Sequence, residues 1–189
     1  MLSLADTKKG MVLITGSAGT GKSTTLACMI DRINHSRDCH IITMEDPIEY
    51  IHHHEKAIVT QREISIDTPG YLESLRSALR ESPDVILLGE MRDYDTISAA
   101  MTAAETGVLL LSTLHTSSAA NTINRILDVF PANQQKQVKI QLAQILMGVV
   151  CQQLVSASDG GQIAVFEVMK TTTAIQNMIR EDKLHQLES

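Results

Sequence analysis

The sequence predicts an α/β domain in which helices cover both faces of a mostly parallel β-sheet. Two observations lead to this prediction. Short apolar runs alternate with longer amphipathic stretches, and a glycine-rich loop joins the first run to the first such stretch. Buried parallel strands have short continuous apolar sequences, and the helices that connect them are amphipathic. The length of 189 residues suits one domain with one substantial core.

The first two thirds of the chain divide into strands and helices of ordinary length. The predicted strands are Val12–Thr15, His40–Met44, Val85–Leu88 and Val108–Leu114. The predicted helices are Lys22–Ile33, Tyr71–Glu81, Tyr94–Thr106 and Ala119–Leu127. Asp93 is a good N-cap for the third helix, and Gly107 is a good C-cap.

Past Pro131 the pattern changes. Asn133–Val150 is predicted as one long helix, because apolar residues recur along it at helical spacing. Gln153–Val155 and Ile163–Val168 are predicted as strands joined by a turn. A last helix is expected to run to Asp182, with Thr173 as its cap. No repeat or long linker interrupts the chain, so residues 1–189 are expected to form a single domain.

Charge and composition disfavour several classes of protein. The net charge of −6 disfavours a nucleic-acid partner, which needs clustered Lys and Arg. No apolar run approaches the roughly 20 residues that cross a bilayer, and the first ten residues lack the layout of a signal peptide. We therefore expect a cytoplasmic protein without direct membrane insertion. The three cysteines are widely spaced, which argues against a disulfide framework or a zinc site.

The glycine-rich loop Gly16–Ser23 matches the phosphate-binding pattern G-x-x-x-x-G-K-[S/T]. It follows a predicted strand and opens a predicted helix, as the motif requires. Glycines let backbone N–H groups turn toward a phosphate, and the helix N-terminus adds partial positive charge. Lys22 can span the β- and γ-phosphates, and the Ser23 hydroxyl can bind Mg²⁺. The predicted nucleotide-binding residues are Ser17, Ala18, Gly19, Thr20, Gly21, Lys22, Ser23 and Thr24.

Hydrolysis also requires a magnesium anchor and a group that orients the attacking water. In open α/β sheets such groups follow the carboxyl ends of strands. Glu90 follows Val85–Leu88 and is our candidate for binding the metal with Ser23, although a solvated glutamate would give the same pattern. Glu45 follows His40–Met44 and is our candidate for the base, although an acidic turn would give the same pattern.

The histidines fall into two groups of interest. His115 follows the strand Val108–Leu114 and is a candidate contact for the γ-phosphate, although a plain hydrogen-bonding histidine is equally compatible. His52, His53 and His54 are consecutive, so their side chains alternate in direction in an extended segment and form a poor metal chelate.

Together these segments resemble the PilT family of type IV pilus retraction ATPases, within the secretion ATPase superfamily. The resemblance extends from about Gly10 to Gln186. The matching segments are GSAGTGKSTTLA (16–27), TMEDPIEY (43–50), VTQREI (59–64), SALRESPDVILLGEMRD (77–93), TAAETG (102–107) and STLHTSSAANTINRILDVFP (112–131). The resemblance implies a three-layer RecA-like P-loop core that hydrolyses ATP with Mg²⁺. It also implies that Glu45 activates water, Glu90 helps to hold Mg²⁺, and His115 lies near the γ-phosphate.

The resemblance further implies a hexameric ring that acts with an inner-membrane pilus platform protein at the cytoplasmic face of the membrane. The family's N-terminal PAS-like domain, which is thought to supply arginines to the neighbouring nucleotide, is missing from this chain, and its C-terminal tail is shortened. We therefore expect weak hydrolysis by this chain alone. Gln176 stands where the family has an arginine. The single Cys151, in place of the four-cysteine motif of extension and type II secretion ATPases, favours retraction.

Three other functions fit parts of the pattern. A nucleotide-binding assembly module of a secretion or pilus-extension ATPase would bind ATP but turn over little. A small nucleoside kinase would need an arginine-rich lid and an acceptor pocket, and neither is evident in the sequence. A DNA translocase shares the fold but is disfavoured by the acidic charge. Phosphate transfer to an added nucleoside would identify the kinase, and release of free phosphate would identify the motor.

Overall fold

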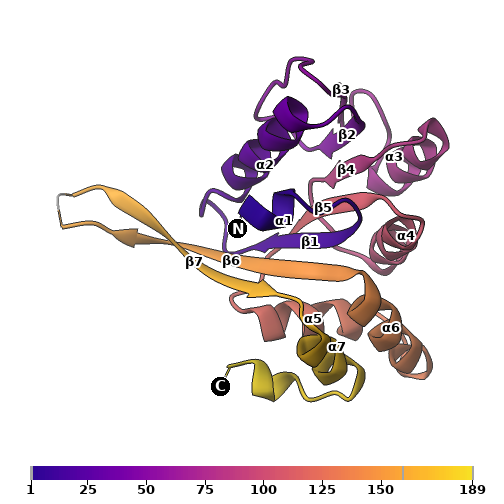
Figure 1. The fold of residues 1–189 in the computed structure, drawn as a ribbon, viewed down its shortest axis with the longest axis vertical. Helices are drawn as coiled ribbons and strands as arrows, with labels where there is room; N and C mark the ends of the chain where they lie inside the picture. The colour runs from indigo at the N-terminus through magenta and orange to yellow at the C-terminus, as the bar shows by residue number, and fades with distance from the viewer. Residues whose placement is uncertain (1, 159, 189) are drawn as a thin grey trace.

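The computed structural model describes residues 2–158 and 160–188, which form a seven-stranded sheet with helices on both faces (Figure 1). The strands are β1 Gly10–Thr15, β2 His40–Glu45, β3 Ile58–Glu63, β4 Val85–Leu88, β5 Leu109–Leu114, β6 Leu146–Ser156 and β7 Gln162–Lys170. The helices are α1 Leu2–Ala5, α2 Lys22–Ser36, α3 Tyr71–Ala78, α4 Tyr94–Glu105, α5 Ala119–Asp128, α6 Ala132–Ile145 and α7 Thr173–Arg180. Two 3₁₀ turns follow α3 and α7, at Leu79–Glu81 and Leu184–Glu188.

The strand order is β3-β2-β4-β5-β1-β6-β7. Neighbouring strands from β3 to β6 pair in parallel, and only β7 runs antiparallel to its neighbour. The predicted α/β class with a mostly parallel sheet is confirmed. The four strands predicted in the first part of the chain are present, with ends that differ by no more than two residues.

The two faces of the sheet are covered unequally. On one face α1 and α2 enclose a core that includes Val12 and Ile14 of β1. On the other face the helices α3 to α7 enclose a larger core that includes Met11 and Leu13. Alternate residues of a strand point to opposite faces, so β1 contributes to both cores and all six of its residues are buried. This two-sided burial explains the continuous apolar sequence of the central strands.

One prediction for the second part of the chain is wrong. Residues 133–150 do not form one helix, because α6 ends at Ile145 and β6 begins at Leu146. The apolar residues that follow Ile145 pair with β1 instead, where Val149 and Val150 are buried on opposite faces of the sheet. A side chain at Gly148 would meet the Met169 carbonyl of β7 at 2.7 Å. The strand is therefore fixed by tertiary pairing, which overrides the local helical spacing.

Smaller differences concern an edge strand and a cap. The edge strand β3 was not predicted, since its sequence is polar and most of its side chains are only half-buried. The cap of α7 is Thr172, one residue before the predicted Thr173, and its hydroxyl oxygen accepts a hydrogen bond from Ile175 N. The predicted cap Asp93 is confirmed, because its carboxylate accepts from Thr96 N.

The hairpin formed by β6 and β7 extends beyond the body of the domain (Figure 1). We call its outer part, residues 153–158 and 160–166, the arm. The predicted turn at 156–161 lies at its tip, and Asp159 falls outside the described residues. Several apolar side chains of the arm are exposed, including Ile163 and Val165. The arm therefore contributes little to the core.

Substitution of two isoleucines tests this division between body and arm. Ile86 is fully buried in β4, whereas Ile163 is 55% exposed. Ile86→Ala should lower the free energy of unfolding by about 2–5 kcal/mol, because it leaves a cavity in the core. Ile163→Ala should lower it by about 0.5 kcal/mol or less. Urea unfolding followed by circular dichroism measures both values, and equal effects would contradict the assignment of the core.

Candidate active site

A cleft of about 280 Å³ lies at the edge of the sheet where the parallel strands have their carboxyl ends. The register aligns the ends of four strands there: Thr15 pairs with Leu114, and Leu88 pairs with both Met44 and Ser112. The loops that follow β1, β2, β4 and β5 therefore meet at one place. The predicted residues that line the cleft are Ala18, Gly19, Lys22, Ser23, Glu45, Glu90 and His115.

Four of the predicted nucleotide-binding residues do not line the cleft, and these are Ser17, Thr20, Gly21 and Thr24. The Thr20 hydroxyl donates to Ser17 O at 2.9 Å, so these two residues stabilise the loop internally. Gly21 precedes α2 in a left-handed conformation, and no side chain caps the helix. The first N–H groups of α2 therefore lack a side-chain partner, which suits an anion at this terminus.

The Lys22 ammonium group is held inside its own loop. Its side chain is only 9% exposed, and Nζ donates to Gly16 O at 3.0 Å and Ser17 O at 2.8 Å. Burial lowers the pKa of Lys22, and the nearby Glu90 carboxylate opposes that shift. The ammonium group thus lies beside the cleft and donates to two neutral carbonyl oxygens. A phosphate can replace these partners, because its negative charge makes a stronger hydrogen bond.

Glu90 is the central acid of the cleft. Its side chain is 15% exposed and forms an ion pair with the guanidinium group of Arg92. His115 Nε2 lies 3.7 Å from Glu90 Oε2, so the residues that follow β4 and β5 are adjacent. Arg92 also lines the cleft. This arginine was not predicted as a site residue, because its orientation depends on the turn after β4.

Glu45 lies at the end of β2 and is held by two donors. Thr43 Oγ1 donates to Glu45 Oε1 at 2.7 Å, and Gln61 Nε2 approaches the same oxygen at 3.3 Å. Gln61 belongs to the edge strand β3 and also accepts a hydrogen bond from His52 N. Both donors approach Oε1, so the other carboxylate oxygen receives no hydrogen bond from either.

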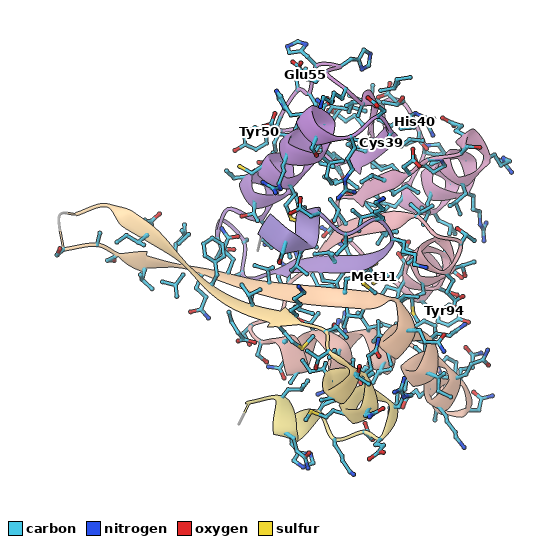
Figure 2. All side chains as sticks on the ribbon, viewed as in Figure 1. Met11, Cys39, His40, Tyr50, Glu55 and Tyr94 are labelled. Carbon is cyan, nitrogen blue, oxygen red and sulfur yellow. The ribbon has the colours of Figure 1, made fainter. Side chains whose placement is uncertain are left out.

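Glu49 is an acid of the cleft that was not predicted as a site residue. Its Oε1 accepts a hydrogen bond from Ser23 Oγ at 2.8 Å, which places it directly against the predicted magnesium ligand. The neighbouring Tyr50 hydroxyl lies 2.8 Å from Thr24 Oγ1, and Figure 2 shows Tyr50 beside α2. The loop after β2 thus folds back onto the start of α2. The signal available in the sequence was its position four residues after Glu45, beyond the turn at Pro47.

Two further residues of the cleft were not predicted to belong to it. Tyr71 begins α3 and lines the cleft, and burial is the main cause that raises the pKa of its phenol. A side chain at Gly89 would lie 2.9 Å from the Tyr71 hydroxyl, so the turn before Glu90 passes close to this ring. His52 also lines the cleft, and burial lowers the pKa of its imidazole.

The side chains of the cleft suit Mg²⁺ that binds together with a nucleotide better than Mg²⁺ that is held by protein groups alone. Within residues 2–158 and 160–188, no group of three His, Cys, Asp or Glu side chains is arranged to hold a metal. Among these described residues, the consecutive histidines His52, His53 and His54 form no such group. Mg²⁺ is usually bound by one or two protein groups and the phosphates of the substrate. The Ser23 hydroxyl, in the first turn of α2, and the Glu90 carboxylate, after β4, both line the cleft and provide such groups.

The family model described as "Type II/IV secretion system protein" matches residues 1–188. The chain belongs to this family. It is 53% identical over 98% of its length to the type IV pilus retraction ATPase PilT of Pseudomonas aeruginosa, and 49% identical to a twitching motility protein of Neisseria gonorrhoeae. It covers 54% and 50% of these proteins, so the chain spans about half the length of the curated relatives it matches.

Solved structures of this family have the same fold. A structure of the pilus retraction motor PilT with bound ADP has a TM-score of 0.97 and 52% identity, covering 99% of this chain and 55% of that one. The ATPase DotB of Legionella pneumophila has a TM-score of 0.92 and 30% identity, covering 99% of this chain and 54% of that one. The predicted RecA-like secretion ATPase core is confirmed. Among the described residues, none forms a helix long and apolar enough to cross a membrane.

Removal of the loop lysine tests the assignment of the cleft. Lys22→Ala should weaken ADP binding by about 10- to 100-fold, since a charged hydrogen bond contributes about 1.5–3 kcal/mol. Lys136→Ala, which removes an exposed lysine of α6, is the matched control and should leave affinity unchanged. Isothermal titration calorimetry measures both. Equal affinity of the Lys22 variant and the unaltered chain would rule out this loop as the phosphate site.

Proposed function

We propose that this chain is the ATP-binding and ATP-hydrolysing motor domain of a type IV pilus retraction ATPase, the machine of twitching motility. The observation that supports this most strongly is the convergence of Lys22, Ser23 and Glu90 in one cleft. They come from two separate segments of the chain, and parallel strands place those segments together. The identity of 53% to PilT supports retraction as the process served.

In this proposal the phosphate loop binds the β-phosphate through its backbone N–H groups. Lys22 moves from the carbonyl oxygens of Gly16 and Ser17 onto the β- and γ-phosphates. Ser23 and Glu90 would hold Mg²⁺, which would supply positive charge to the phosphates. Glu49, now bonded to Ser23, would orient that hydroxyl toward the metal. His115, adjacent to Glu90, would contact the γ-phosphate.

The attacking water requires a carboxylate with a free oxygen near the γ-phosphate. We assign this role to Glu45, whose Oε1 is fixed by Thr43 and Gln61. Glu49 is the other candidate for this role, because it also lines the cleft and lies against Ser23. The two acids differ in what holds them: Glu45 is positioned by the sheet, and Glu49 by the P-loop itself.

The chain is proposed to be one RecA-like domain, residues 1–189, of a protein that assembles into a hexameric ring. This proposal rests on the resemblance to the PilT family and on the length of the relatives, of which the chain covers about half. In such a ring a neighbouring subunit supplies arginines to the nucleotide. The ring would act with a pilus platform protein at the cytoplasmic face of the inner membrane, without entering the membrane.

Phosphate release tests the proposed activity. Mg²⁺-dependent release from ATP should rise in specific activity with protein concentration, because subunits complete one another's sites, and Glu90→Gln should abolish it. The measurement is a free-phosphate assay over a range of protein concentrations. Clear ATP binding without release would instead identify the chain as a nucleotide-binding assembly module.

Paired substitutions distinguish the two candidate bases. Glu45→Gln should lower turnover by about 10²–10⁴-fold while ATP affinity stays within a few fold, because a general base acts in the transition state. Glu49→Gln should raise the Mg²⁺ concentration needed for half-maximal activity, since it alters the partner of Ser23. Turnover and Mg²⁺ titrations measure these effects. The reverse pattern would transfer the role of the base to Glu49.

A further inference from the structure

Gln152 lies on β6, one residue before the arm, beyond every motif that the proposed function uses. It is a polar residue with only 4% of its surface exposed. A buried carboxamide is costly unless its nitrogen and its oxygen are both hydrogen-bonded. Both are paired here, and both partners belong to the phosphate loop or the first turn of α2.

The two hydrogen bonds fix the side chain in one orientation. Gln152 Nε2 donates to the backbone carbonyl oxygen of Thr20 at 2.5 Å, and Gln152 Oε1 accepts from Thr25 Oγ1 at 2.7 Å. A carbonyl oxygen can only accept, so the amide nitrogen must face Thr20. The carboxamide therefore bridges the loop and the helix that follows it.

We propose that Gln152 is a positioning residue that directs the Gly21 N–H group toward the β-phosphate. This inference rests on the proposed nucleotide-binding function. The carbonyl of Thr20 and the N–H of Gly21 belong to one peptide group, which is planar and trans, so the two point in opposite directions. Because Gln152 holds the carbonyl on the side of β6, the N–H is turned to the opposite side. It is then preorganised as a phosphate donor.

The close approach of Gln152 also accounts for two glycines of the loop. A side chain at Gly16 would lie 2.3 Å from the backbone oxygen of Gln152. A side chain at Gly21 would lie 2.9 Å from Gln152 Nε2, and Gly21 has a φ of +86°, which favours glycine. The backbone and side chain of one β6 residue thus support the loop at both of its ends.

Two affinities of the 189-residue chain test this role. The affinity for ADP is measured by calorimetric titration, and the affinity for AMP is measured by its competition with ADP. Gln152→Met keeps the length of the side chain and its neutrality but removes both hydrogen bonds. It should weaken ADP binding by about tenfold, whereas AMP, which lacks a β-phosphate, should lose about twofold or less. Gln153→Met is the matched control, because this neighbour is exposed, and it should bind both nucleotides as the unaltered chain does.

If Gln152→Met lowers the unfolding temperature of the nucleotide-free chain, its loss of ADP affinity no longer reports on positioning alone. A second variant then carries the test. Thr25→Val removes only the hydroxyl partner of Gln152 and should weaken ADP binding by about threefold. It should add no further loss in a variant that already carries Gln152→Met, because the two residues act as a unit. Unchanged ADP affinity in the folded variants, or equal losses of ADP and AMP, would overturn the inference. Failure of the unaltered chain to bind ADP would instead contradict the proposed function.

Discussion

The parallel pairing of β1, β2, β4 and β5 is the constraint on which the site depends. The residues of the cleft lie at the carboxyl ends of these strands, in the loops that follow them, or at the starts of α2 and α3. A slip of one residue in any pairing would turn the buried side chains of that strand to the opposite face of the sheet. The pairing register of β1, β4 and β5 therefore fixes the position of the cleft residues as well as the core.

Electrostatics of the cleft follow from that arrangement. Four acids line it, Glu45, Asp46, Glu49 and Glu90, and they face two permanent cations, Lys22 and Arg92. The phosphates of a nucleotide would add further negative charge. A divalent cation that accompanies the nucleotide offsets this excess, which explains in physical terms why metal and nucleotide are expected to bind together.

The phosphate loop and four strands of the body could be predicted because their signals are local. Glycine spacing identifies the loop, and apolar runs identify β1, β2, β4 and β5. The end of α6 could not be predicted, because Leu146 to Val150 continue an apolar pattern that suits a helix as well as a strand. Only the pairing with β1 decides between them. Glu49 and Gln152 were missed for the same reason, since their partners lie 26 and 127 residues away.

The place of Gln152 in the chain bears on how such domains are delimited. A fragment cut after the last recognisable motif, near Pro131, would contain the glycine loop and every acid of the cleft, yet it would lack the strand against which the loop rests. Its loop peptides would be free to rotate, and nucleotide would have to order them at the expense of affinity. Boundaries drawn from motifs alone therefore understate the length of chain that a competent nucleotide site requires.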